Sequence, residues 1–93
     1  MIYKVEFTKH CAKQLKKVPG HVLVKLETWI SSIELQGLEE TRRIPGYHDE
    51  LLKGKRDGQR SIRLNKAWRA IYIVKSSNIE FVEVQEVTHH DYR

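Results

Sequence analysis

The chain has 93 residues and one cysteine, so we expect a single domain spanning residues 1–93, with no internal disulfide and no thiol-based zinc site. Its formal net charge of +5 and isoelectric point of about 9.5 favour an anionic partner, such as nucleic acid or an acidic protein. No apolar run approaches the ~20 residues of a membrane helix, and charges interrupt the N-terminal residues, so we expect no membrane segment, no secretory signal and a cytoplasmic location.

The first part of the chain predicts one strand followed by two helices. Residues 2–7, IYKVEF, alternate between polar and apolar types, which favours a strand. Thr8 offers an N-cap oxygen for a first helix, which Pro19 and Gly20 end. The apolar residues at helical spacing in this helix are Phe7, Cys11, Leu15 and Val18. A second helix, ending near Gly37, has one apolar face made of Val22, Leu26, Trp29, Ile30 and Ile33.

The rest of the chain predicts a loop followed by three strands. Residues 38–57 have no clear period and include Pro45 and Gly54, so we expect a loop that Leu51 and Leu52 anchor to the core. The strand candidates are residues 60–65, 68–75 and 80–87. Short turns between them imply an antiparallel meander. The predicted fold class is therefore α+β: an N-terminal strand, a two-helix hairpin and a three-strand antiparallel meander, forming one twisted sheet with the helices on one face.

Arginine occurs inside two of the predicted strands. In RSIRLN, residues 60–65, strand alternation places Ile62 and Leu64 on the core face and Arg63 on the open face. Arg69 lies near the start of the next strand, whose two apolar faces indicate a central position, and it can reach the same open surface. Because a guanidinium binds two phosphate oxygens at once, the two arginines could form a preorganised anion site. The alternative is that each is an ordinary solvated surface side chain.

Charge near these arginines favours the anion site. Between positions 53 and 69 the only acidic residue is Asp57, whereas the basic residues are Lys53, Lys55, Arg56, Arg60, Arg63, Lys66 and Arg69. The cationic surface is therefore concentrated in one stretch of the chain.

The chain end carries side chains that can exchange protons or stack on a base: His89, His90, Asp91 and Tyr92. The alternative is a frayed polar terminus. A metal site built from His48, His89, His90 and Asp91 lacks the i, i+4 ligand spacing of a helix, and Cys11 falls on the apolar stripe of the first helix. We therefore expect no metal, no cofactor and no cysteine nucleophile.

Two motifs resemble a known family. LLKGKRDGQRSIRLNKAWRAIY, residues 51–72, resembles the central signature of RelE-superfamily toxins, in particular the HigB or proteic killer branch. The ending VEVQEVTHHDYR resembles the terminal V-x-x-H-D-Y of that branch. The predicted helical hairpin before the signature also matches in length and order, so the resemblance covers essentially the whole chain. It implies a ribosome-dependent mRNA endoribonuclease of a type II toxin–antitoxin module. Its partners would be the ribosome, mRNA and a cognate antitoxin, a small helix-turn-helix protein.

The resemblance also implies roles for individual residues. Arg63 and Arg69 match the arginines that stabilise the scissile phosphate. His90, Asp91 and Tyr92 match the tail that positions and deprotonates the nucleophile, which is the RNA 2′-hydroxyl. The residues expected to hold the RNA backbone are Lys53, Lys55, Arg56 and Arg60. Because the superfamily uses tyrosine, histidine or aspartate as its general base, the choice among the tail residues, His89 included, stays open.

Two other functions fit the same features. A ParE-like toxin would share the fold but inhibit gyrase by binding, without cleaving RNA. A simple nucleic-acid-binding module would bind free RNA or DNA with a strong salt dependence and would not cleave it.

Overall fold

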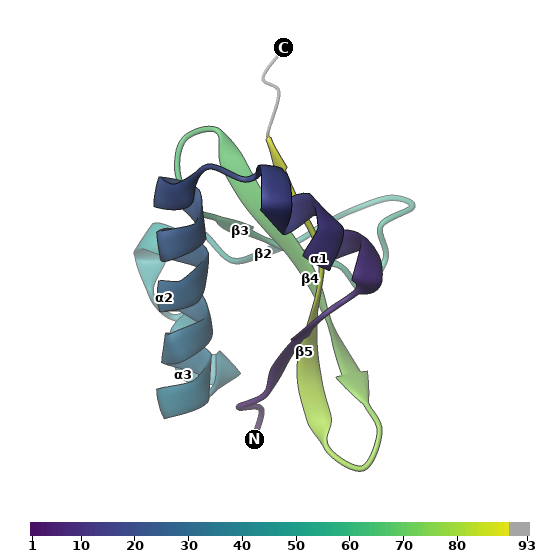
Figure 1. Ribbon diagram of the computed structural model, residues 1–93. Coiled ribbons are helices and arrows are strands. Elements are labelled where there is room, and N and C mark those ends of the chain that lie inside the picture. Colours follow the sequence, from purple (N-terminus) through teal and green to yellow (C-terminus); the bar gives the residue numbers. More distant parts are fainter. Residues whose placement is uncertain (90–93) are drawn as a thin grey trace.

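The structure is a computed structural model that describes residues 1–89 (Figure 1). Its elements are β1 (Val5–Phe7), α1 (Lys9–Gln14), the 3₁₀ turn η1 (Leu15–Lys17), α2 (Gly20–Gln36), α3 (Leu38–Arg42), the 3₁₀ turn η2 (Pro45–Tyr47), β2 (Glu50–Leu51), β3 (Arg60–Arg63), β4 (Trp68–Ser76) and β5 (Glu80–His89). This order confirms the predicted α+β class, with its N-terminal strand, helices and closing three-strand meander. None of the helices within residues 1–89 is long and apolar enough to cross a membrane.

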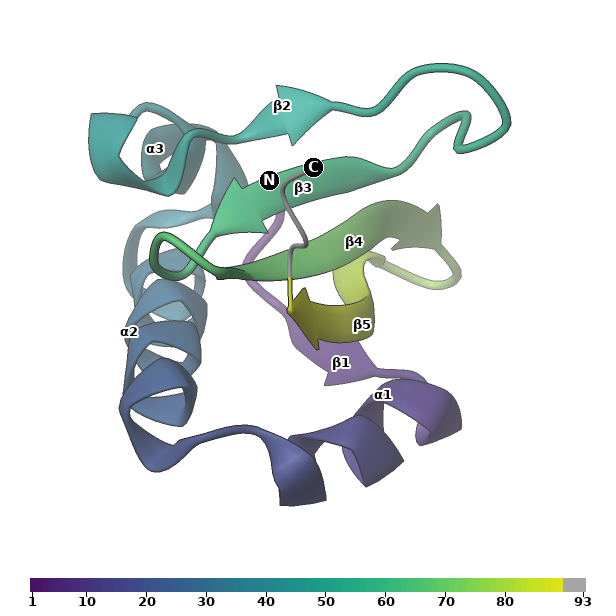
Figure 2. The ribbon, with the colours of Figure 1, turned by 90° about the horizontal axis from the view of Figure 1, so that it is seen from above.

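The strands form one mixed sheet of five strands in the order β1-β5-β4-β3-β2 (Figure 2). β3, β4 and β5 are antiparallel neighbours, as the short turns predict. β4 is the central strand, as its two apolar faces indicate. β1 joins the outer side of β5 in parallel, with Val5 opposite Val82.

A β-bulge in β5 lets that strand keep its apolar residues on one face. Tyr72 pairs with Val84 and Ala70 pairs with Val87, so Gln85 is the extra residue on the bulged strand. Val84 and Val87 are both buried against the helices, although they lie three positions apart. In an uninterrupted strand Val87 would face away from Val84, and the extra residue of the bulge turns both valines to the core face.

The core lies between the helices and one face of the sheet. Figure 1 shows α1 in front of β4 and β5, with α2 beside them. The buried residues form one cluster, made of Cys11, Val18, Val22, Leu26, Trp29, Ile33 and Leu38 from the helical segments and Ile62, Leu64, Ala70, Tyr72, Val82, Val84 and Val87 from the sheet. At its centre the rings of Trp29 and Tyr72 lie 5.3 Å apart between centroids. The core face predicted for the second helix is confirmed, with Ile30 only partly buried at its margin.

The segment expected to be a loop, residues 38–57, contains the short helix α3. Leu38 and Thr41 are buried, and the Thr41 hydroxyl donates to the carbonyl of Gly37 over 2.9 Å. The Leu38 amide donates to the carbonyl of Ile2 over 2.8 Å. Tertiary contacts thus stabilise a helix that is too short to show a period in the sequence.

The same segment also contains β2, which pairs with β3 through Glu50–Ser61 and Leu51–Arg60. Leu51 is 56% exposed, so the expectation that it anchors this segment was wrong; Leu52 is half-buried. Phe7, expected on the first helix stripe, instead ends β1 and is partly exposed, because α1 begins only after Thr8.

Candidate active site

Arg63 and Arg69 lie directly opposite each other on the two neighbouring strands β3 and β4. Thr88 continues this row on β5, and all three residues lie on the face that the helices leave open. Like charges directly opposite each other destabilise a sheet. An anion bound between the two guanidiniums would remove that repulsion, so the pairing indicates a binding role.

The row lies in a groove of about 400 Å³ on the open face, which we call the arginine groove. The residues that line it are His48, Glu50, Leu52, Arg56, Ser61, Arg63, Arg69, Ile71 and Thr88. Ser61 and Ile71 are buried beneath the charged side chains, although they belong to the open face. The groove thus has a small polar and apolar floor, and its lining includes three arginines, Arg56, Arg63 and Arg69, and one carboxylate, Glu50.

The turn between β3 and β4 fixes the position of Arg69. The Asn65 side-chain oxygen accepts from the amides of Ala67 and Trp68 over 2.8 and 2.9 Å. Arg69 Nη1 in turn donates to the carbonyls of Asn65 and Trp68 over 3.0 and 3.3 Å. Arg63 is exposed, and within residues 1–89 its side chain forms no hydrogen bond or ion pair. One guanidinium is therefore held by the turn, while the other is available to a ligand.

The basic loop between β2 and β3 is tied to the sheet through Arg56. Arg56 Nη2 lies 3.3 Å from Glu86 Oε1, and Arg56 Nε donates to the Gln59 side-chain oxygen over 2.8 Å. Figure 2 shows this loop extending past the ends of β2 and β3. Lys53 and Lys55 are exposed along it. Arg56 thus lines the groove, whereas the two lysines flank it.

Arg60, expected to contact RNA, lies on the opposite face. It pairs in register with Tyr72, and its Nε donates to Asp49 Oδ1 over 2.6 Å. The Tyr72 hydroxyl donates to Asp49 Oδ2 over 2.5 Å, and Arg42 Nε lies 3.4 Å from that hydroxyl. The Asp49 side chain is 2% exposed, so we call these four residues the buried carboxylate cluster. Arg60 neutralises a buried charge there and is not part of the arginine groove.

Protonation in this cluster follows from burial and from the carboxylate. Burial, and then the hydrogen bond to Asp49, raises the pKa of Tyr72, so its hydroxyl keeps the proton that it donates. Burial is the largest single influence and lowers the pKa of the Arg60 guanidinium, but the hydrogen bond and charge of Asp49, together with Tyr72, outweigh it and raise that pKa overall. Both donors therefore keep their protons across the physiological pH range.

His48 and Glu50 were not among the expected groove residues. They flank Asp49, and both line the arginine groove while Asp49 is buried. His48 adopts a left-handed conformation with a φ of 50°, which costs a non-glycine residue roughly 1–3 kcal/mol and is found most often at functional sites. No local motif marks the two residues, because Arg60 and Tyr72, which hold Asp49 in place, lie far along the chain.

The described part of the tail lies apart from the groove. His89 pairs in register with Trp68, and their rings meet edge-on with centroids 5.4 Å apart. This places His89 in a different pocket, beside Gln14 and Lys17. The other expected tail residues, His90, Asp91 and Tyr92, lie outside the described residues.

Two further features bear on the chemistry expected of this chain. Burial, with a smaller contribution from Glu86, raises the pKa of the Cys11 thiol to about 11, so Cys11 is a protonated core residue at neutral pH. No group of three or more histidine, cysteine, aspartate or glutamate side chains within residues 1–89 is arranged to hold a metal ion.

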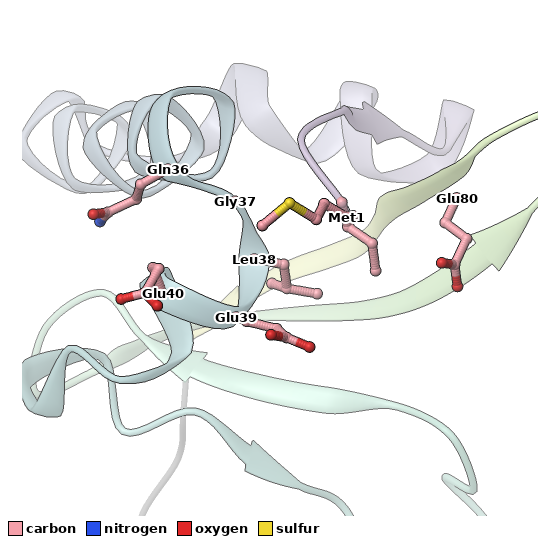
Figure 3. Close-up of a pocket in the computed structure, with 8 residues that line it drawn as sticks. Met1, Gln36, Gly37, Leu38, Glu39, Glu40 and Glu80 are labelled. Carbon is pink, nitrogen blue, oxygen red and sulfur yellow. The ribbon is translucent and has the colours of Figure 1, made fainter.

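A smaller pocket of about 170 Å³ lies where the N-terminus meets the junction of α2 and α3 (Figure 3). Met1, Ile2 and Leu38 give it apolar walls, and its charged residues are Glu39, Glu40 and Glu80. Carboxylates repel phosphate, so the electrostatics of this pocket oppose those of the arginine groove.

Comparison with protein-family models and with curated proteins finds no match. Solved structures do match, and the class of protein that they define is the small toxin of the RelE, YoeB and YafQ type. YafQ from E. coli strain BL21(DE3) matches with a TM-score of 0.73 at 16% identity, over 92% of this chain and 91% of that one. A chain of the archaeal RelE–RelB complex from Pyrococcus horikoshii OT3 matches with a TM-score of 0.71 at 18% identity, over the whole of both chains. The YoeB/ParE toxin from Agrobacterium tumefaciens matches with a TM-score of 0.68 at 21% identity, over 95% and 99%.

These matches establish the fold. The chain has the fold of the RelE superfamily of toxins, as the motif resemblance implies, and the HigB branch stays a prediction.

Proposed function

We propose that this protein is the toxin of a type II toxin–antitoxin module, of the HigB branch, and that it cleaves ribosome-bound mRNA in the cytoplasm. The observation that carries the proposal is the pairing of Arg63 with Arg69 at the centre of the arginine groove. A site built on strands is rigid, so both arginines are aimed before the substrate arrives. The toxin fold of the matching structures supports the same function.

In the proposed reaction the RNA 2′-hydroxyl is the nucleophile. Its oxygen forms a bond to the adjacent phosphorus and gives its proton to a general base. The bond from phosphorus to the 5′ oxygen breaks, and a general acid protonates that oxygen. The products are a 2′,3′-cyclic phosphate and a free 5′-hydroxyl. Arg63 and Arg69 stabilise the negative charge that develops on the phosphoryl oxygens, where one fixed donor can contribute ~3–4 kcal/mol.

Proton transfer has candidates within the groove and in the tail. His48 and Glu50 line the groove together with the two arginines. The family resemblance adds His90, Asp91 and Tyr92 as the groups that position and deprotonate the 2′-hydroxyl. The proposal needs one of these groups as the base and another as the acid.

The RNA backbone would lie along the basic loop. Lys53 and Lys55 are exposed there, and Arg56 can exchange its contact with Glu86 for a phosphate. The ribosome would hold the mRNA in the groove, and positioning of this kind can lower a barrier by ~7–11 kcal/mol. A small set of catalytic groups is then sufficient. The growth-inhibiting activity would be held in check by a cognate antitoxin, a small helix-turn-helix protein.

The decisive experiment is single-turnover cleavage of ribosome-bound mRNA at saturating protein. Arg63→Ala should keep the fold by circular dichroism and reduce the cleavage rate by about 10²–10³-fold, the effect of losing one such donor. Arg43→Ala is the matched control, because Arg43 is an exposed arginine outside the groove, and it should cleave at the wild-type rate. Lys55→Ala should weaken binding with a smaller effect on the chemical step.

Three results would contradict the proposal. Cleavage by Arg63→Ala at the wild-type rate would show that the site is misplaced. Gyrase inhibition by a protein that cleaves nothing on ribosomes would favour the ParE-like function. Salt-dependent binding of free RNA without cleavage would favour a simple binding module.

A further inference from the structure

A second pocket adjoins the arginine groove at the end of β5, and we call it the Trp68 pocket. It has a volume of about 220 Å³, and the residues that line it are Gln14, Lys17, Val18, Trp68, Val87, Thr88 and His89. Thr88 lines the arginine groove as well, so the two sites meet at this residue.

The edge of β5 connects the two sites. Within residues 1–89, β1 pairs with residues 82–84 of β5, and no strand pairs with the outer side of β5 after Val84. The open face and the helix face of the sheet therefore meet along this edge. The row of Arg63, Arg69 and Thr88 leads across the strands to the same edge. An RNA chain that follows the row can place its next base in the Trp68 pocket.

Aromatic rings and valines give this pocket surfaces that suit a nucleobase. The rings of Trp68 and His89 meet at 89° with centroids 5.4 Å apart, and the register of β4 and β5 sets the two residues opposite each other. His89 is exposed, whereas Val18 and Val87 are buried beneath the pocket. Nucleobases stack on aromatic side chains held in this way. The sheet thus fixes a ring surface for a base before RNA binds.

The polar side chains of the pocket are hydrogen-bond donors. Gln14 Oε1 accepts from the Val87 amide over 2.9 Å, which leaves the two hydrogens of Gln14 Nε2 available to a ligand. Lys17 is exposed, and within residues 1–89 it forms no ion pair. Guanine presents two acceptors, O6 and N7, on one edge, whereas adenine presents a donor, N6, beside N7. The two donors therefore match guanine and leave the amino group of adenine without an acceptor.

A phosphate and a folded peptide fit this pocket less well than a base does. Lys17 is the one cationic side chain in its lining, whereas three arginines line the arginine groove beside it. Its volume is below the ~300–1,000 Å³ of sites that hold larger ligands. A single planar ring system with acceptor atoms on one edge meets both conditions.

We propose that the Trp68 pocket binds the base of a nucleotide next to the scissile phosphate, and that it prefers guanine. The inference rests on the proposed function for the position of cleavage, but binding of the base can be tested without cleavage. Gln14 and Lys17 would then determine the sequence preference, although they belong to the helical segment and not to the strands that carry the arginines.

The binding test uses fluorescent tetranucleotides without 2′-hydroxyl groups, which the proposed reaction cannot cleave. Four versions carry guanine, adenine, cytosine or thymine at one internal position of a thymine background, and fluorescence anisotropy measures their affinities. Wild type should bind the guanine version at least ~5-fold more tightly than the adenine version. His89→Ala should weaken all four by a similar factor, because stacking does not distinguish the bases.

Two variants test the hydrogen-bond donors. Gln14→Glu keeps an oxygen for the Val87 amide and replaces the donor with an acceptor, so the preference for guanine should be lost. Lys17→Met should reduce that preference. Lys16→Met is the matched control, because Lys16 is an exposed lysine of the same turn η1 that does not line the pocket, and it should keep the wild-type preference.

Cleavage on ribosomes gives the second readout. Messenger RNAs that exchange guanine for adenine on either side of the scissile phosphate should differ in kcat/KM at one of the two positions, and Lys17→Met should reduce this difference while Lys16→Met keeps it. Equal affinity of wild type for the four tetranucleotides, absence of binding, or tighter binding of adenine would overturn the proposal. A guanine preference that survives in both Gln14→Glu and Lys17→Met would also overturn it. If wild type cleaves nothing on ribosomes, the proposed function fails, while the tetranucleotide affinities still decide the pocket.

Discussion

Replacing Tyr72 with phenylalanine tests the buried carboxylate cluster that holds His48 and Glu50 at the arginine groove. The change deletes one hydroxyl, which donates to Asp49, and leaves the ring in its packing against Trp29. A hydrogen bond to a charged group contributes about 1.5–3 kcal/mol, and water cannot replace this one because the Asp49 side chain is 2% exposed. We therefore expect the free energy of unfolding to fall by about 1.5–3 kcal/mol.

Urea denaturation measures this loss, with Tyr3→Phe as the control. Tyr3 is 41% exposed, so loss of its hydroxyl should change the free energy of unfolding by less than about 0.5 kcal/mol. A double-mutant cycle with Asp49→Asn separates the pair from its surroundings, and the two changes should be non-additive. A Tyr72→Phe protein within about 0.5 kcal/mol of wild type would refute the view that this hydroxyl stabilises the carboxylate.

Glu86, Gly37 and Cys11 give three independent tests. Glu86→Gln removes the carboxylate partner of Arg56, so RNA binding should tighten, and titration over a salt series should give a logarithmic salt slope that is steeper by about 0.7. An unchanged slope would show that Arg56 contacts no phosphate. Gly37→Ala should lower the free energy of unfolding by about 1–3 kcal/mol in urea denaturation, because Gly37 has a φ of 90°, which strains any residue that carries a Cβ. Gly20→Ala is the control, because Gly20 has no positive φ and open space for a Cβ, and it should not destabilise the protein. Burial raises the pKa of Cys11 from its ordinary 9.0 to about 11, so the folded state holds this proton more tightly than the unfolded state does. As the pH rises from about 9 to about 11, the free energy of unfolding of wild type should therefore fall relative to that of Cys11→Ala. A constant difference between the two free energies across that range would contradict the assignment of Cys11 as a buried, protonated thiol.

Periodicity in the sequence predicted the parts of the fold that face the core. Val22, Leu26 and Trp29 recur at helical spacing, and the structure buries all three. Strand alternation correctly separated Ile62 from Arg63, and it placed Arg63 on the open face. These predictions succeed because burial of apolar area depends on spacings of a few residues, which are visible locally.

The missed features depend on contacts between distant parts of the chain. Alternation alone puts Arg60 on the same face as Ile62, so its exclusion from the groove could have been predicted from the strand. Its partner Asp49 could not, because that contact depends on how residues 38–57 cross the edge of the sheet. His48 and Glu50 reach the groove only because Asp49 is buried between them, which explains why neither carries a local signal.

The parallel pairing of β1 with β5 has a consequence for when the protein becomes functional during its synthesis. The contact between Thr8 and Gln85 joins residues 77 positions apart, and closing a loop of that size costs about 4 kcal/mol of chain entropy. The sheet is therefore complete only after β5 has been translated, and a nascent chain lacking β5 also lacks the strand that supports β4 and Arg69. A nascent chain that lacks β5 would therefore have no assembled arginine groove, and the activity proposed above would require β5 to be synthesised and paired.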